Sequence, residues 1–248
     1  IQLFLFLKMK INHNILWAEI FFNELANLGI KYACISPGSR STPLTYAISK
    51  NKKIKSYIII DERTSAFFAT GLARKTNSPV VLVCTSGTAV AEFYPAIIEA
   101  FYQRIPLIIC TADRPIEALN NGTNQTIEQN NIYRNHIRFF DDVGLPELTE
   151  SRINHLKSIA NRAFYECKIK SQGPVHLNFP FRKPLEPSSY TDEIDYKYYE
   201  KIFSIKQSFS LKKYDLVLNN DAHFLPNRKI IKYIISLIIN ENKGLIIV

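Results

Sequence analysis

Short apolar segments that are typical of buried strands alternate with segments of helical periodicity through the first 110 residues of this chain. The strand-like segments are 32–35, 55–60, 80–84 and 107–110, and the helical segments are 14–28, 42–49, 64–75 and 89–102. The connections are short, so successive strands must run parallel while the helices pack back onto the sheet. The sequence therefore predicts an α/β fold, a parallel sheet with helices on both faces. We expect Asn14 to cap the first helix and Pro95 to bend the fourth.

The pattern continues beyond residue 120 and changes after Pro180. We expect a helix over 151–167 and a strand over 174–179. The Asn- and Gln-rich stretch 120–148 is interpreted as a long functional loop that carries a short helix and a strand near 137–140. Residues 181–210 have the composition of an interdomain linker, and residues 227–248 predict a helix and a strand of a second, truncated α/β domain. We place a first domain over 1–185, and the linker with the start of the second domain over 186–248.

The ends of the chain suggest a piece of a longer protein. Met9 is the only methionine, and the chain stops inside a strand-like segment. We expect translation to begin at Met9 and the chain to be the N-terminal part of something longer. Residues 1–7 are apolar but too short to span a bilayer, and no basic segment precedes them as a secretion signal requires. We therefore expect a cytoplasmic protein with no membrane partner.

Composition narrows the classes of function further. With 46% apolar and 21% charged residues, a chain of 248 residues can bury a sizeable core. The net charge of +9 can indicate a nucleic-acid partner, but the lysines are scattered, so nucleic-acid binding is the least favoured function. The four cysteines form no Cys-x-x-Cys pair and the five histidines have no ligand spacing. We expect buried, reduced thiols and no metal ligands in this chain.

Polar clusters follow four of the predicted strands. They are Ser36–Ser41, Asp61–Arg63, Thr85–Thr88 and Thr111–Pro115. Ligands of open α/β sheets bind outside the carboxyl ends of the strands, where these clusters are expected to meet. The glycine patterns G-x-G-x-x-G, G-x-x-x-x-G-K-[ST] and G-x-S-x-G are absent from the sequence, so a dinucleotide fold, a P-loop and a serine hydrolase are not supported.

Glu62 and Arg40 carry the most specific chemistry, and each has two interpretations. Glu62 follows an apolar strand, so its carboxyl group is expected to be partly desolvated, with a raised pKa suited to proton transfer with a ring nitrogen. Alternatively it complements a helix dipole or pairs with Arg63. The segment from Pro37 to Arg40 offers a close backbone approach, a hydroxyl and a guanidinium to an anion, or it is an ordinary turn with a solvated Arg40.

The four clusters together resemble one family. Ser36-Pro-Gly-Ser-Arg-Ser-Thr-Pro-Leu44, Asp61-Glu-Arg63, Thr85-Ser-Gly-Thr-Ala-Val90 and Thr111-Ala-Asp-Arg-Pro115, followed by Asn124-Gln125, are similar to the motifs of the thiamine-diphosphate-dependent 2-succinyl-5-enolpyruvyl-6-hydroxy-3-cyclohexene-1-carboxylate synthases, the MenD family. The resemblance runs from about Asn14 to Pro184 and implies that this part is the pyrimidine-binding domain. Several motifs in the same order are more specific than any one of them.

The resemblance implies the reaction and the site. The enzymes of this family decarboxylate 2-oxoglutarate and add the succinyl unit to isochorismate in menaquinone or phylloquinone biosynthesis. Glu62 matches the glutamate that bonds the aminopyrimidine ring of thiamine diphosphate. The matched substrate-binding residues are Ser39, Arg40, Arg114, Asn124 and Gln125, and the expected cofactor-binding residues are Pro37, Gly38, Glu62, Thr85, Ser86 and Gly87.

One departure limits what this chain does alone. The Gly-Asp-Gly…Asn motif that holds Mg²⁺ and diphosphate in the family is absent, so the chain would supply half of each site in a homodimer or homotetramer. We expect the isolated chain to be inactive and to bind thiamine diphosphate negligibly. The alternatives are another thiamine diphosphate enzyme, of the acetolactate synthase or 2-oxoacid decarboxylase type, and a natural half-subunit that needs a separate partner.

Overall fold

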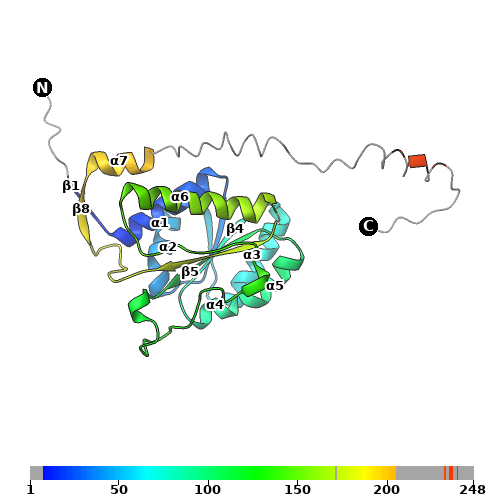
Figure 1. The fold of residues 1–248 in the computed structure, drawn as a ribbon, viewed down its shortest axis with the longest axis horizontal. Coiled ribbons are helices and arrows are strands. Elements are labelled where there is room, and N and C mark those ends of the chain that lie inside the picture. The colour runs from blue at the N-terminus through cyan, green and yellow to red at the C-terminus, as the bar shows by residue number, and fades with distance from the viewer. Residues whose placement is uncertain (1–7, 171, 205–231, 233–234, 237–238, 240–248) are drawn as a thin grey trace, which may run out of the picture. The chain divides into compact units, whose positions relative to one another are not determined.

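A six-stranded parallel sheet forms the centre of the fold, as predicted (Figure 1), in a computed structural model that describes residues 8–170, 172–204, 232, 235–236 and 239. The strand order is β3-β2-β4-β5-β7-β6. The strands are β2 (Tyr32–Ile35), β3 (Lys55–Ile58), β4 (Val80–Cys84), β5 (Leu107–Asp113), β6 (Phe140–Asp142) and β7 (Pro174–Pro180). Every pair is parallel, so the carboxyl ends of all six strands lie at the same edge of the sheet.

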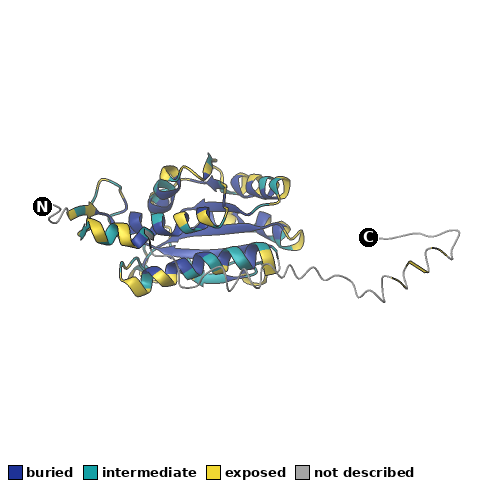
Figure 2. Cartoon of the chain, turned by 90° about the horizontal axis from the view of Figure 1, so that it is seen from above, coloured by how far each residue is buried: buried dark blue, intermediate teal, exposed yellow. Residues whose placement is uncertain are grey.

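Helices cover both faces of this sheet and create two cores. The first face carries α1 (His13–Asn27), α2 (Thr42–Lys50) and α6 (Glu150–Tyr165), and the second carries α3 (Glu62–Thr76), α4 (Thr88–Glu92) and α5 (Tyr94–Tyr102). Alternate residues of β4 serve opposite cores: Val81 packs in the first and Leu82 in the second. Figure 2 shows the buried sheet between helices whose outer surfaces are exposed.

Two helix ends differ from the sequence prediction. The cap of α1 is Asn12 and not Asn14, because the extended backbone of Asn12 lets its Oδ1 accept hydrogen bonds from the backbone amides of Asn14 and Ile15, at 3.0 and 3.3 Å. The helix expected over 89–102 is two helices, α4 and α5, which meet at Phe93. Pro95 causes the break because it has no amide hydrogen to donate to the preceding turn.

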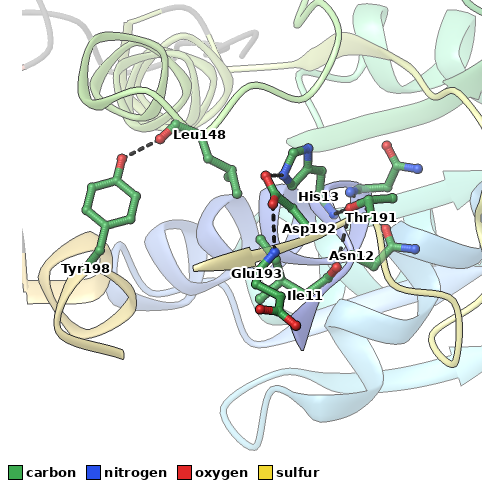
Figure 3. A network of polar contacts seen from close by, with 9 residues as sticks. Ile11, Asn12, His13, Leu148, Thr191, Asp192, Glu193 and Tyr198 are labelled. Carbon is green, nitrogen blue, oxygen red and sulfur yellow. Dashed lines mark hydrogen bonds and ion pairs between the residues drawn. The ribbon is translucent and has the colours of Figure 1, made fainter. Parts of the chain in front are cut away.

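The segment interpreted as a linker contains ordered structure that packs on the first domain. Strand β8 (Asp192–Asp195) pairs antiparallel with β1 (Lys8–Ile11) and leads into α7 (Tyr196–Ser204). We refer to residues 8–12 and 189–204, which include β1, β8 and α7, as the strap. Figure 3 shows its polar contacts: Tyr198 donates to the carbonyl of Leu148, and the His13 amide donates to Thr191 Oγ1 at 2.9 Å. The domain boundary near residue 185 stays a prediction.

The second domain expected after the linker falls outside the described part of the chain. Residues 205–231 and 240–248, which include the expected terminal strand, are not described, and of the helix expected over 227–239 only residues 232, 235, 236 and 239 are. Among the described residues, no helix has both the length and the apolar character that a membrane span requires.

Candidate functional site

The polar segments after the parallel strands meet at the carboxyl edge of the sheet. We call residues 36–41, 61–63, 85–88, 111–115 and 124–125 the rim. Residues 111–113 are the last residues of β5, which is longer than the predicted strand over 107–110. The first segments of the rim are joined where β2 and β3 end, because Ser36 Oγ donates to the carbonyl of Ile59 at 2.9 Å. The predicted convergence of these clusters follows from the parallel topology, since each segment leaves its strand on the same side.

Gly38 allows the first rim segment to lie directly against the end of β4. A Cβ at this position would be only 2.4 Å from Thr85 Cβ. The backbone of Gly38 is extended, with φ of −163°, so any residue could adopt the conformation. Space is what excludes a side chain here. The segment 36–41 can therefore contact Thr85 only as long as residue 38 is glycine.

Gly87 has the same role between the next two segments, and it is also conformationally restricted. Its φ is +84°, and a Cβ would lie 2.7 Å from Gln125 Cγ. Two hydrogen bonds of 3.0 Å complete this contact: Ser86 Oγ donates to the Gln125 carbonyl, and Gln125 Nε2 donates to the Ser86 carbonyl. The rim segment after β4 and the segment 124–125 are thus fixed against each other.

Two guanidinium groups lie in this rim without an acidic partner. Arg40 donates to the Phe181 carbonyl at 2.7 Å, and Arg114 donates to Ser86 Oγ at 3.2 Å and to the Asn124 carbonyl at 2.6 Å. The Nε atoms of both arginines are buried and have no hydrogen-bond partner. Within the described part of the chain, neither guanidinium has a carboxylate oxygen within 4.0 Å.

The electrostatics of the two arginines favour an anionic ligand. Burial lowers the pKa of Arg40 below its ordinary value, and the positive charge of Arg114 lowers it further, while Asp113 partly opposes this effect. The guanidinium of Arg114 has this effect because like charges repel, and a negative charge placed beside the two cations would oppose that repulsion. A carboxylate or phosphate is the kind of group that a planar guanidinium binds through two hydrogen bonds.

Glu62 begins α3 next to the end of β4. Asp61 caps this helix, with its Oδ1 accepting from the Thr64 amide at 2.7 Å, so the carboxylate of Glu62 is not used as the cap. The predicted alternative of a pair with Arg63 is not formed, since these two described residues make no ion pair. Glu62 is half-buried, and its charge reaches Cys84, whose pKa is raised first by burial and second by this carboxylate.

The structure brings most of the predicted site residues into one cluster, whereas Pro37, Ser39 and Glu62 lie at its margin. The joined set is Gly38, Arg40, Thr85, Ser86, Gly87, Arg114, Asn124 and Gln125. Pro37 and Ser39 instead line an adjoining cleft of about 460 Å³ against α2. Among the described residues no hydrogen bond or ion pair joins Glu62 to this set, although its charge acts on Cys84 at the end of β4. Their functional roles stay predictions.

Two residues of this site, Gln129 and Asn178, were not anticipated from the sequence. Both are 1% exposed and lie beneath the rim. A signal for Asn178 is present in the sequence: His176 and Asn178 are alternate polar residues in an otherwise apolar strand, and alternate residues share one face. Gln129 has no such signal because it lies in an irregular segment. Among the described residues, no group of three or more His, Cys, Asp or Glu side chains could hold a metal ion.

Comparison with known protein families agrees with this geometry. Residues 17–132 match the thiamine pyrophosphate enzyme N-terminal TPP binding domain. These residues contain α2, α3 and every rim segment.

The curated relatives carry one name. A 2-succinyl-5-enolpyruvyl-6-hydroxy-3-cyclohexene-1-carboxylate synthase of Haloquadratum walsbyi is 49% identical over 183 residues, 74% of this chain and 30% of that protein. The synthase of Oceanobacillus iheyensis is 46% identical over 174 residues, 70% of this chain and 30% of that protein. That of Microcystis aeruginosa is 42% identical over 224 residues, 89% of this chain and 39% of that protein.

The chain spans about a third of the length of these relatives, with 30% to 39% of each covered. The match includes the segments that form the rim, and the domain family agrees with the parallel fold. The chain therefore belongs to the family of thiamine-diphosphate-dependent 2-succinyl-5-enolpyruvyl-6-hydroxy-3-cyclohexene-1-carboxylate synthases, and it contains that family's N-terminal thiamine-diphosphate-binding domain.

Proposed function

We propose that this chain is part of an enzyme that decarboxylates 2-oxoglutarate and transfers the resulting succinyl unit to isochorismate in menaquinone or phylloquinone biosynthesis. The observation that carries the proposal is the pair of guanidiniums, Arg40 and Arg114, without carboxylate partners in the rim of a domain from this family. Both substrates are carboxylic acids that are ionised at neutral pH, so an uncompensated cationic site suits them.

The residues present fit a cofactor in the same rim. Gly38 and Gly87 let the rim segments pack directly against Thr85 and Gln125, and Thr85 and Ser86 add two buried hydroxyl groups at the same edge of the sheet. We assign Pro37, Gly38, Thr85, Ser86 and Gly87 to the cofactor side. Thiamine diphosphate, when bound, supplies the electron sink that decarboxylation of a 2-oxoacid needs. Its diphosphate and Mg²⁺ are assigned to parts of the relatives that this chain does not match.

Glu62 is assigned to proton transfer. A carboxyl group at the start of α3, beside the buried end of β4, is positioned to hold a proton at a ring nitrogen of the cofactor. Ser39, Arg40 and Arg114 then bind substrate carboxylates, and Asn124 and Gln125 orient the rest of the substrate by hydrogen bonds. In the reaction, the bond to the 2-oxoglutarate C1 carboxylate breaks with loss of CO₂. The electron pair that remains forms a carbon–carbon bond to isochorismate, one of whose carbon–carbon double bonds opens and takes up a proton at its other carbon.

The assembly and location belong to the same proposal. Glu62 and the arginines lie on one domain, so a second domain must cover them to exclude water. We propose that a homodimer or homotetramer provides this cover, through the pyrimidine domain, in the cytoplasm. By itself, the 248-residue chain is expected to bind thiamine diphosphate negligibly, and tight Mg²⁺-dependent binding in calorimetry would contradict this.

The decisive experiment is an assay of the complete protein with 2-oxoglutarate and isochorismate. We expect CO₂ release that depends on isochorismate and one equivalent of the succinylated product. Turnover of pyruvate or another 2-oxoacid without isochorismate would instead indicate an acetolactate synthase or 2-oxoacid decarboxylase. Absence of product with either set of substrates would reject the proposed function.

A further inference from the structure

A buried pair of side-chain amides, Gln129 and Asn178, connects the rim to the sheet. Gln129 Nε2 donates to Asn178 Oδ1 at 2.9 Å and to the Ala112 carbonyl at 3.2 Å. Because Nε2 is the donor in both bonds, the other atom of this amide, Oε1, is free to accept. It accepts from the backbone amide of Gly87 at 2.9 Å. One side chain therefore fastens the Gly87 segment to the ends of β5 and β7.

The orientation of the Asn178 amide is fixed in the same way. Its Oδ1 accepts from Thr111 Oγ1 at 2.9 Å as well as from Gln129. Since the Thr111 hydroxyl gives its proton to Asn178, it must accept from His176 Nε2, which lies 2.7 Å away. His176 Nδ1 is then the bare nitrogen, and it is indeed buried without a partner. In this series of hydrogen bonds, each side chain determines which atom of the next one donates and which accepts.

Asn178 also controls a carboxylate beside the two arginines. Its Nδ2 donates to Asp113 Oδ2 at 2.9 Å, while Asp113 Oδ1 accepts from the backbone amide of Arg114 at 2.7 Å. Both oxygens of Asp113 are thus bound by amides. Among the described residues, this carboxylate forms no ion pair with either guanidinium, although it is close enough to influence Arg40.

We propose that Gln129 and Asn178 are positioning residues for the anion site: Gln129 holds the Gly87 and Gln125 segments in register, and Asn178 keeps Asp113 from neutralising Arg40 and Arg114. Neither residue touches substrate. The proposal rests on the proposed function for its kinetic consequences, but not for its structural ones. Loss of the Asn178 donor frees Asp113 to turn toward a guanidinium, which removes positive charge that the substrate would otherwise meet.

The structural consequence is tested on the 248-residue chain by exchange of the Gly87 amide hydrogen, followed by NMR. In the wild type this amide should exchange slowly because Gln129 Oε1 accepts its hydrogen. Gln129→Met has similar length but no acceptor and should accelerate exchange by about tenfold or more. Gln129→Glu keeps the acceptor oxygen and should retain the protection. Rapid exchange in the wild type, or equal exchange in wild type and Gln129→Met, would overturn the proposal.

The kinetic consequence is tested in the complete protein with Asn178→Asp, at saturating cofactor. This change keeps Oδ1 and replaces the donor that faces Asp113. We expect KM for 2-oxoglutarate to rise about tenfold while kcat changes less than about threefold, as the loss of one charge-related contact implies. Asn161→Asp, on α6 and outside the rim, is the matched control. The Asn161 Nδ2 also donates to a carboxylate, Glu24 Oε1, and to a backbone carbonyl, both at 2.8 Å.

The outcomes separate the two proposals. An unchanged KM in Asn178→Asp, or an equal rise in Asn161→Asp, overturns the positioning role. If Asn178→Asp does not fold, the Gly87 exchange rates of the wild type and the Gln129 variants decide it. If the wild-type protein makes no succinylated product, the proposed function fails. The exchange rate of the Gly87 amide still tests the positioning role of Gln129 in that case.

Discussion

The rim and the strap are both rich in polar groups, but they use them differently. In the strap, two charged groups have ion-pair partners: Lys201 Nζ lies 2.9 Å from Glu150 Oε2, and Asp192 Oδ2 lies 3.4 Å from His13 Nε2. In the rim, Arg40 and Arg114 have no acidic partner, and their Nε atoms are buried without a hydrogen bond. Both side chains are half-buried, and their lack of acidic partners is the difference on which the proposed anion site rests.

The largest effect is expected at Glu62 in the rim. In the complete protein, Glu62→Gln should slow product formation by at least about hundredfold, because an amide cannot exchange a proton with the cofactor's ring nitrogen. The direct measurement is deuterium exchange at the thiazolium C2 of bound thiamine diphosphate, which should slow in parallel. Unimpaired exchange would eliminate Glu62 as the activating group, and the thermal stability of the variant provides the control.

The next largest effect is expected at the unpaired cations of the rim. Arg40→Gln should raise KM for 2-oxoglutarate or isochorismate by about 10- to 100-fold, because a charge-assisted hydrogen bond to a carboxylate is lost. Arg74→Gln, on the exposed side of α3, is the matched control and should leave KM unchanged. Equal kinetics for both variants would remove the distinction between rim and surface.

The glycines of the rim provide a steric test. Gly87→Ala should raise KM about tenfold and lower the free energy of unfolding by about 1–2 kcal/mol, because the new Cβ meets Gln125 and the residue is strained at positive φ. Gly122→Ala is a close control: its φ is +75°, but a Cβ there has no atom within 4 Å. It should show the backbone strain without the change in KM. Equal KM values would mean that the Gly87 contact does not shape the site.

A fourth test uses the histidine buried beneath the rim. Burial lowers the pKa of His176 to about 3, whereas the unfolded chain binds this proton near pH 6.5. Between these values the unfolded state holds the extra proton, so this contribution to stability is complete above pH 6.5 and is lost as the pH falls. The loss should reach about 1.4 kcal/mol per pH unit in urea unfolding. His176→Gln should flatten this dependence, and an unchanged slope would contradict the assignment.

The strap should respond in stability alone, and by a smaller amount. Asn12 caps α1 and its Nδ2 donates to the Ser189 carbonyl at 2.8 Å, so Asn12→Ala should cost about 1–2 kcal/mol in urea unfolding. Asn12→Asp keeps the capping oxygen and loses only the donor, and should cost less. Neither variant should change KM in the complete protein, and a clear change would mean that strap and rim are coupled.

Most of the fold was predictable because it depends on local pattern. The strand segments read as apolar runs, and their short connections forced a parallel sheet. The predicted cap of α1 was wrong by two residues. Asn12 and Asn14 are both suitable caps, and only the backbone conformation distinguishes them. Strand β8 has no apolar pattern because it is polar and partly exposed. It is recognisable only through its pairing with β1, more than 180 residues away.

The residues of the rim could be predicted from the sequence, but the buried side chains that hold them in place could not. Arg40, Ser86 and Arg114 stand at strand ends, where topology alone brings them together. Gln129 lies in a segment of irregular structure, and its contact with Gly87 bridges 42 residues of sequence. Local pattern contains no information about such a contact. The pairing of amide donors and acceptors beneath the site therefore had to be seen in three dimensions.

The pairing of β1 with β8 also has a consequence for biosynthesis. A ribosome releases Lys8 long before Asp195, so the first strand must wait for its partner until nearly the whole unit has emerged. Strand β7 lies between β5 and β6, so the sheet itself closes only when residues 174–180 arrive. During translation, β1 stays unpaired until residues 192–195 emerge and the outer edge of β5 until residues 174–180 do, and chaperones that shield unpaired strands would act in those intervals.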